Sequence, residues 1–210
     1  FGTSLVSSTF AALLPIFYQD YLGLSARWIG IASGIYAVWN AINDPLFGHI
    51  TDNTRSKLGR RIPYLRFTAP FLGLTFILVW FAPQGTGEVK LFWWMLITML
   101  LYDTCYTIVG LVHGALMPEL SESDVERNEL SISSSVFGLA GYIIGFLLPD
   151  MFRPQAGSQD TSLLQLQLSM IAIGIGAAFL IILTTLKVKE RREFAIVDKP
   201  IKLWASLRYT

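Results

Sequence analysis

The feature that most constrains this chain is the length of its uncharged, apolar stretches. A helix that crosses a bilayer needs roughly 20 predominantly apolar residues. Charged residues make up only 15% of the chain, whereas soluble domains carry about a quarter. No Asp, Glu, Lys or Arg occurs in residues 1–19, 28–43, 67–87, 130–149 and 161–186. The sequence therefore predicts an all-α, polytopic membrane protein and argues against a soluble domain.

The spacing of these stretches predicts six transmembrane helices joined by short connections. Two of the connections are strongly charged: a basic loop over 52–64 and an acidic loop over 118–130. We expect the helices at about 2–22, 28–51, 65–84, 91–117, 131–151 and 162–187.

Lysine and arginine residues are distributed unequally between the two sides of this topology. Thirteen of the 16 fall in or beside the basic loop, in the acidic loop, or from the end of the last helix onward. Cytoplasmic segments close to membrane helices carry an excess of Lys and Arg. We therefore expect a multi-pass protein of the cell membrane, with both ends in the cytoplasm and the first helix running outward.

The second helix and the loop that follows it carry a long polar motif. The motif begins with Trp39, Asn43, Asp44 and Pro45 and ends in a cluster of cations. Its loop part, GHITDNTRSKLGRR, resembles the loop signature of the major facilitator superfamily. The whole segment is similar to the helix-two pattern of the glycoside–pentoside–hexuronide:cation symporters, the melibiose permease-like family, and reads WNAINDPLFGHITDNTRSKLGRRIPYL.

This resemblance implies one half of a twelve-helix major facilitator fold. Residues 1–187 would form the N-terminal six-helix bundle, and residues 188–210 a cytoplasmic central linker to a second half. In such transporters the substrate site lies near the midplane, at the interface between repeats. The expected function is cation-coupled symport of a sugar or glycoside-like small solute by alternating access. H⁺ or Na⁺ would be the coupling ion, with no other cofactor, and the partners would be the solute, the bilayer and the C-terminal half.

Asp44 is the main candidate for cation coupling. It lies about seven residues from the cytoplasmic end of its helix, roughly 10 Å deep. Ionisable groups at such depth face the bundle interior and are functional candidates. Pro45 lacks a backbone N–H and frees a carbonyl nearby. Asn40, one turn earlier, and Thr107, which matches the family's polar set on the fourth helix, complete the expected cation site. Two other interpretations remain open: Asp44 holds the loop in one conformation, and Asn40 forms an interhelical hydrogen bond.

The fourth helix supplies the expected substrate-binding residues, together with one aromatic residue of the second helix. They are Asp103, Tyr106, Gly110 and Trp39. Asp103 would bind polar groups of the solute or carry a proton, and Trp39 would stack on a sugar ring. The alternatives are a local hydrogen bond from Tyr106 or Thr107 to Asp103, and core packing for Trp39.

The depth of the two carboxylates can be compared, because the second and fourth helices both run inward. We expect Asp44 to be level with about Gly110. Asp103 would then lie about seven residues, or roughly 10 Å, further outward. On this expectation Asp103 does not replace the helix-four acid of the family, whose position is Gly110.

The two charged loops are expected to meet on the cytoplasmic face and to act as a gate. Individual surface ion pairs contribute only about 0–1 kcal/mol, so such a gate needs a network. The alternative is that the cations only fix the topology. The expected gating residues are Asp52, Arg55, Arg60, Arg61, Glu126 and Arg127.

The sequence contains no motif of an enzyme, a metal centre or a nucleic-acid-binding module. The alternative to a transporter is a non-transporting six-helix scaffold subunit of a larger membrane complex. Three departures from the family's charged positions favour it, because the resemblance places a carboxylate at Asn40 and at Gly110 and an arginine at Ser134.

Overall fold

The computed structural model describes residues 1–54, 61–120, 123–151 and 159–187. These residues form six long helices and one short π-helical segment, and no strand occurs among them. The expected linker at 188–210 lies outside the described residues. The elements are α1 Gly2–Ile16, the π-helix η1 Phe17–Tyr21, α2 Ala26–Asn53, α3 Ile62–Val79, α4 Glu88–Leu120, α5 Asp124–Met151 and α6 Gln159–Lys187.

Two helices, α3 and α5, begin earlier than expected for local reasons. Helix α3 begins at Ile62 with a proline in its first turn, where the fixed φ of proline suits a helix and its missing N–H costs nothing. Helix α5 begins at Asp124, so much of the expected acidic loop is helical. The backbone N–H of Glu126 donates to the Ser123 Oγ at 3.2 Å. A serine cap and acidic residues in the first turn both stabilise a helix N-terminus.

The first expected helix is divided into two parts. Helix α1 contains Pro15, and it passes into the π-helical turn η1. The N–H of Leu22 donates to the carbonyl of Phe17 at 3.2 Å, which is the five-residue spacing of a π-helix. Proline removes a helical donor, and π-helical turns occur mostly as single-turn insertions. The regular part of this helix therefore has only 15 residues.

Four of the helices are long and apolar enough to cross a membrane by length and composition. Within the described residues they are the segments Ile62–Val79, Glu88–Leu116, Asp124–Leu148 and Leu163–Leu186. Helix α1 is shorter than this requirement, and α2 mixes its apolar residues with polar ones. The structure thus shows the six expected helices but not six spans.

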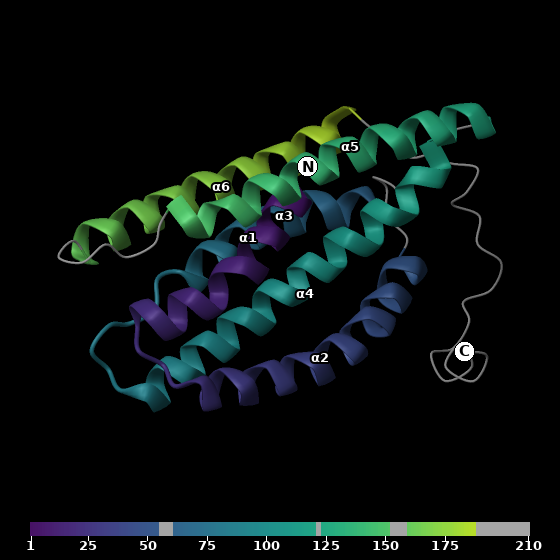
Figure 1. The fold of residues 1–210 in the computed structure, drawn as a ribbon. Coiled ribbons are helices and arrows are strands. Elements are labelled where there is room, and N and C mark those ends of the chain that lie inside the picture. The colour runs from purple at the N-terminus through teal and green to yellow at the C-terminus, as the bar shows by residue number, and fades with distance from the viewer. Residues whose placement is uncertain (55–60, 121–122, 152–158, 188–210) are drawn as a thin grey trace.

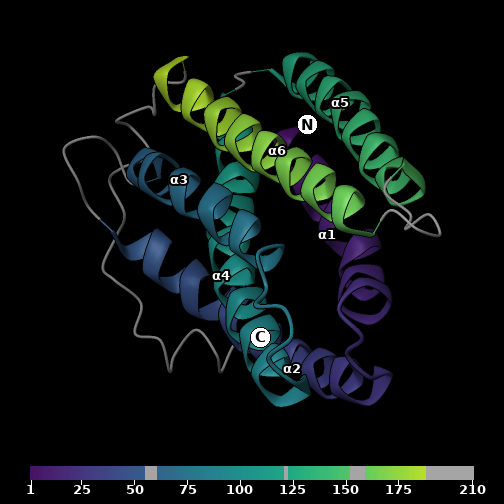
Figure 2. The ribbon, with the colours of Figure 1, turned by 90° about the vertical axis from the view of Figure 1, so that its left-hand side faces the viewer.

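The helices pair in a way that relates α1–α3 to α4–α6. Helix α1 packs on α5, and its equivalent α4 packs on α2. Helix α3 packs on α4, and its equivalent α6 packs on α1. Helices α3 and α6 also pack on each other. Figures 1 and 2 show α2 at one side of the bundle and α5 and α6 at the other, with α4 beside α2. This exchange of partners is what two three-helix inverted repeats produce.

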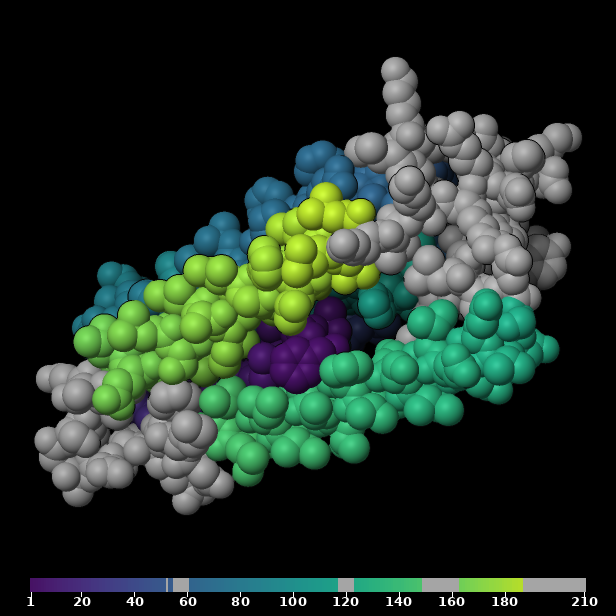
Figure 3. Space-filling model, turned by 90° about the horizontal axis from the view of Figure 1, so that it is seen from above, coloured from purple at the N-terminus to yellow at the C-terminus, as the bar shows by residue number. Residues whose placement is uncertain are grey.

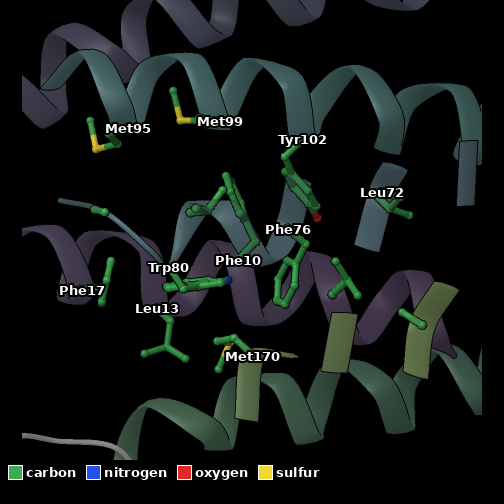
Figure 4. Packing of buried hydrophobic residues seen from close by; sticks show 14 of the residues in the cluster. Phe10, Leu13, Phe17, Leu72, Phe76, Trp80, Met95, Met99, Tyr102 and Met170 are labelled. Atoms are coloured by element: carbon green, nitrogen blue, oxygen red, sulfur yellow. The ribbon is translucent and has the colours of Figure 1, made fainter. Parts of the chain in front are cut away.

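The core lies between α1, α3, α4 and α6 and is rich in aromatic residues (Figure 4). The ring of Tyr102 stacks on Phe10 with 4.3 Å between centroids and lies 6.0 Å from the ring of Phe76. Trp80 contacts Phe17 and Phe76 edge to face, at 5.3 and 5.8 Å. Each of these rings buries a large apolar area, and its orientation toward the neighbouring rings adds further stabilisation. Helix α2 contributes little to this core.

Three side chains cap the last carbonyls of α3. Tyr18 Oη donates to the carbonyl of Val79 at 2.8 Å, and Gln167 Nε2 donates to that of Trp80 at 3.1 Å. Trp94 Nε1 donates to the carbonyl of Leu78 at 3.2 Å. Helix C-termini leave carbonyls without helical partners. The donors from η1, α4 and α6 satisfy these carbonyls at the end of α3, which lies at Val79, five residues before the expected end at 84.

Small residues allow the closest helix contacts. A Cβ at Gly73 of α3 would lie 2.7 Å from the Gly174 carbonyl oxygen of α6. At the α1–α5 contact, Ser8 Oγ donates to the carbonyl of Gly141 at 3.3 Å. Figure 3 shows α1 lying in the gap between the ridges of α5 and α6. Close backbone approach through small residues is the usual means of helix association in membranes.

The Gly73–Gly174 contact predicts that Gly73→Ala destabilises the bundle. The added methyl group meets a backbone oxygen that cannot turn away, and overpacking costs about 1–3 kcal/mol. We expect a lower midpoint of thermal unfolding in detergent. Gly176→Ala in α6 is the matched control, because its Cβ would meet no atom within 4 Å. An unfolding midpoint for Gly73→Ala at or above that of Gly176→Ala would contradict the close contact.

Candidate functional site

The interface between α2 and α4 carries an unusual density of polar side chains for a contact between apolar helices. Hydrogen-bonded residue pairs occur in the same order along α2 and along α4, so the two helices run parallel. At their N-terminal ends Trp28 Nε1 donates to Glu88 Oε2 at 2.9 Å. Further along, Trp39 Nε1 donates to Thr104 Oγ1 at 3.2 Å. Polar contacts of this kind hold helices together where water is scarce.

Asp103 lies at the centre of this interface. Its side chain is buried, with 2% of the residue exposed. One carboxylate oxygen accepts a hydrogen bond from Tyr36 Oη at 2.9 Å, and the other accepts one from Asn43 Nδ2 at 3.0 Å. Both donors come from α2. Such charge-assisted bonds are stronger than those between neutral groups, so Asp103 is a main link between the two helices.

Asp44 lies beside Asp103 along the same interface. Thr107 Oγ1 donates to Asp44 Oδ1 at 3.2 Å, and Thr107 is buried. Asp44 itself is exposed on the surface of the bundle, whereas Asn40, one turn earlier, is half-buried. The structure therefore brings Asp44 and Thr107 together across the α2–α4 contact, and Asn40 lies one turn earlier on α2.

The expected depth of Asp103 was wrong by about one helical turn. Asp44 faces Thr107 and not Gly110. Asp103 is four residues before Thr107, which separates the two carboxylates by roughly 6 Å along the helix. The expected alternative for Asp103, a local bond from Tyr106 or Thr107, was also wrong, because its donors are on α2. The error arose because the register of two packed helices depends on side-chain contacts and not on loop lengths.

The remaining expected substrate-binding residues lie in different environments. Tyr106 is half-buried and stacks on Tyr102 with 5.9 Å between ring centroids. Gly110 is exposed, and a Cβ there would meet no atom within 4 Å. Trp39 borders an apolar depression on the exposed face of α2. Gly110 follows Thr107 on the same face of α4, so open space adjoins the polar pair of Thr107 and Asp44.

Sequence reasoning missed Tyr36, Asn43 and Thr104. Tyr36 and Asn43 are seven residues apart, or two helical turns, and so lie on one face of α2. Polar groups at that spacing in an apolar segment were a usable signal. Asn43 was read only as part of the family motif, although its immediate neighbour Asp44 points to a different partner.

The expected gating residues are only partly visible. Arg61 is buried and donates from Nη1 to the carbonyl of Ala115 in α4. Arg127 forms an ion pair of 3.8 Å with Asp124 of its own helix. The side chain of Asp52 and residues Arg55 and Arg60 lie outside the described part of the chain. Glu126 lies in the first turn of α5. The expected contact between the two loops stays a prediction.

Comparison with known proteins decides the family. A family model described as MFS/sugar transport protein matches residues 1–208. The chain belongs to this family. It is therefore a multi-pass membrane protein of a transporter family and not an enzyme, and the resemblance noted from the helix-two motif is confirmed.

Three curated relatives of this MFS chain illustrate the breadth of the family. The uncharacterized symporter YnaJ of Bacillus subtilis is 29% identical over 96% of this chain and 44% of its own length. The isoprimeverose transporter of Lactiplantibacillus pentosus is 26% identical over 99% of this chain and 43% of its own. Sodium-dependent lysophosphatidylcholine symporter 1 of Xenopus tropicalis is 24% identical over 94% and 42%. The chain thus spans less than half the length of these relatives.

The hydrogen bonds of Asp103 predict that Tyr36→Phe destabilises this MFS chain. Hydrogen bonds to charged groups contribute about 1.5–3 kcal/mol, and the substitution removes one while keeping the ring. We expect a lower thermal midpoint in detergent. Tyr142→Phe is the control, because Tyr142 is exposed on α5. Equal midpoints for the two variants would show that the Tyr36–Asp103 bond contributes nothing.

Proposed function

We propose that this chain is the N-terminal half of a secondary active transporter. It carries a sugar or glycoside-like small solute together with H⁺ or Na⁺ by alternating access. The observation that supports this most directly is the pair of carboxylates at the α2–α4 interface. Asp44 bonds to Thr107, and Asp103 is buried one turn away. Carboxylates within apolar membrane helices are costly and mark ion or substrate pathways.

Asp44 is suited to bind the coupling cation. It is accessible on the bundle surface, and its oxygen already has a hydroxyl neighbour in Thr107. Hard cations such as Na⁺ prefer ligands of this kind, namely carboxylate, hydroxyl, amide and backbone oxygens. Asn40 supplies a further amide oxygen on the same face, and Pro45 leaves a backbone carbonyl without its helical donor.

The open face beside Gly110 is suited to the solute. Neither Gly110 nor Gly114, one turn further along α4, has an atom within 4 Å of an added Cβ. Asp103 and Tyr106 border this face with polar groups, and Trp39 offers an aromatic ring on α2. The relatives include one named as an isoprimeverose transporter and one named as a sodium-dependent lysophosphatidylcholine symporter.

The whole-transporter arrangement follows the family. All six helices span the bilayer, both ends of the chain lie in the cytoplasm, and residues 188–210 lead to a C-terminal half. The relatives' greater length supports a second half. The excess of cations on one side supports the orientation. In this arrangement the charged ends of α2, α3 and α5, which carry Asp52, Arg61 and Glu126, close the cytoplasmic side.

Asp44→Asn should separate coupling from solute binding in the complete transporter. The substitution keeps the size of the side chain and one acceptor but removes the charge that attracts the cation. We expect gradient-driven accumulation in proteoliposomes to fall to the level of passive exchange, while solute exchange continues. Asp20→Asn is the matched control, because Asp20 is exposed in η1 and remote from the site.

The outcomes for this variant are distinct. Full uphill accumulation by Asp44→Asn under either a pH or a Na⁺ gradient would remove Asp44 from coupling. No solute uptake by the wild-type transporter across a panel of sugars and glycosides would favour the scaffold function instead.

The open face of α4 predicts that Gly110→Val impairs transport without destabilising the bundle. The added side chain meets no atom of the chain within 4 Å at its Cβ, and it projects beside Thr107. We expect solute uptake to fall several-fold while the thermal midpoint in detergent stays at the wild-type value. Gly176→Val in α6 is the control and should change neither quantity. Normal uptake by Gly110→Val would place the solute elsewhere.

A further inference from the structure

A cavity of about 380 Å³ lies at the end of the bundle where η1 ends and α4 begins. Its walls come from η1, the connection between α3 and α4, and the beginnings of α4 and α6. Figure 1 shows this connection and the start of α4 together at one end of the molecule. Small-molecule sites in proteins have volumes of about 300–1,000 Å³. The lining residues are Tyr21, Leu22, Pro83, Gln84, Gly85, Thr86, Gly87, Glu88, Leu91 and Leu163.

The cavity is distant from the open face that we propose for the solute. On α4, Gly110 follows Glu88 by about 22 residues, which is roughly 33 Å at about 1.5 Å per residue. None of the residues that we expected to couple the cation or to bind the solute lines this cavity. Its polar side chains therefore have no role in the site described above.

Three polar side chains of the cavity have groups that a ligand can reach. Gln84 is exposed, and its amide forms no hydrogen bond with another residue of the described chain. The Oγ1 of Thr86 donates to the carbonyl of Pro83 at 3.2 Å, so its oxygen can still accept a bond. Glu88 accepts one bond at Oε2, from Trp28 at 2.9 Å, and keeps its second oxygen for another donor.

The cavity combines these polar groups with an apolar surface and an aromatic ring. Leu22, Pro83, Leu91 and Leu163 line it with apolar side chains, and Tyr21 adds the ring. Binding sites for small molecules combine apolar and aromatic walls with a few polar groups in this way. A sugar has matching properties, because its hydroxyl groups donate and accept hydrogen bonds while the C–H face of its ring is apolar.

The charge of the cavity narrows the class of ligand further. Glu88 is the one carboxylate among the described residues that line it, and no lysine or arginine lines it. A negatively charged ligand is therefore disfavoured. A metal ion such as Ca²⁺ takes about 6–8 oxygen ligands, and the described part of the chain holds no cluster of three or more His, Cys, Asp or Glu residues suited to a metal. A neutral ligand that donates hydrogen bonds to a carboxylate fits best.

We propose that this cavity binds a saccharide, in a second site that is separate from the face beside Gly110. The carboxylate of Glu88 and the amide of Gln84 bond to hydroxyl groups of the sugar, and the ring of the sugar packs on the apolar residues. The place of the cavity on the outer side of the membrane rests on the proposed function, because that function sets the orientation of the chain. A sugar bound here is held at the outer surface before it enters the transporter.

The test is equilibrium dialysis of the purified, complete transporter in detergent against radiolabelled D-xylose, lactose and melibiose, one sugar at a time. Gly110→Val is the background, because its added side chain obstructs the face proposed for the solute. We expect this protein to bind at least one of the sugars. Glu88→Gln in this background should raise the Kd about tenfold, because a neutral acceptor replaces a charged one. Gln84→Leu, which removes the amide, should raise it several-fold.

Asp20→Asn is the matched control in the same background. Asp20 is exposed in η1 at the same end of the bundle, but it does not line the cavity. This variant also removes a carboxylate, so it shows the effect of local charge alone. We expect its Kd to equal that of Gly110→Val.

Each result supports or overturns the saccharide site. No binding of any of the sugars to Gly110→Val, an unchanged Kd in both cavity variants, or an equal rise in Asp20→Asn overturns it. Binding of radiolabelled choline that depends on Glu88, in place of the sugars, also overturns it. If Glu88→Gln does not fold, the Kd of Gln84→Leu decides alone. Cavity-dependent sugar binding in a protein that transports no solute leaves the site standing and removes the proposed function, and uphill transport without cavity-dependent binding does the reverse.

Discussion

The position of α2 depends on a small number of polar contacts with α4. Most of the apolar core lies between α1, α3, α4 and α6, and α2 exposes many of its large apolar residues. The two hydrogen bonds to Asp103 therefore carry a large share of the specific contact of this helix. Apolar contacts in a bilayer do not strongly favour one register, because lipid tails offer similar surroundings. Directional bonds to a buried carboxylate do favour one register, and they fix which residues of α2 face the site.

The sequence allowed the fold class, the number of helices and the family to be predicted, because these follow from long uncharged stretches and one long motif. It placed Asp44, Asn40 and Thr107 near one another through helical spacing and the resemblance. It did not predict the partners of Asp103, since these depend on how α2 and α4 slide against each other. It also did not predict the π-helical turn, which depends on how the end of α1 meets the rest of the bundle.

Equivalent helix contacts in the two halves of the bundle are made by different kinds of residue. The α1–α5 contact is made through small residues, with Ser8 against the backbone of α5. The corresponding α4–α2 contact is made through carboxylates, amides and hydroxyls. Small residues allow backbones to approach closely but offer little chemistry, whereas larger polar groups keep the helices apart and create ligand positions. Equivalent helix pairs are thus joined by small residues and backbone groups on one side of the bundle and by polar side chains on the other.

The side-chain caps of α3 bear on how this helix fits a membrane. At about 1.5 Å per residue, its 18 residues extend about 27 Å, which is slightly less than the roughly 30 Å of hydrocarbon in a typical bilayer. A helix that ends within hydrocarbon normally exposes carbonyls that neither water nor lipid can satisfy. Here Tyr18, Gln167 and Trp94 bind those carbonyls. The end of α3 can therefore lie within the hydrocarbon at a lower cost in unpaired backbone groups than an uncapped helix of the same length.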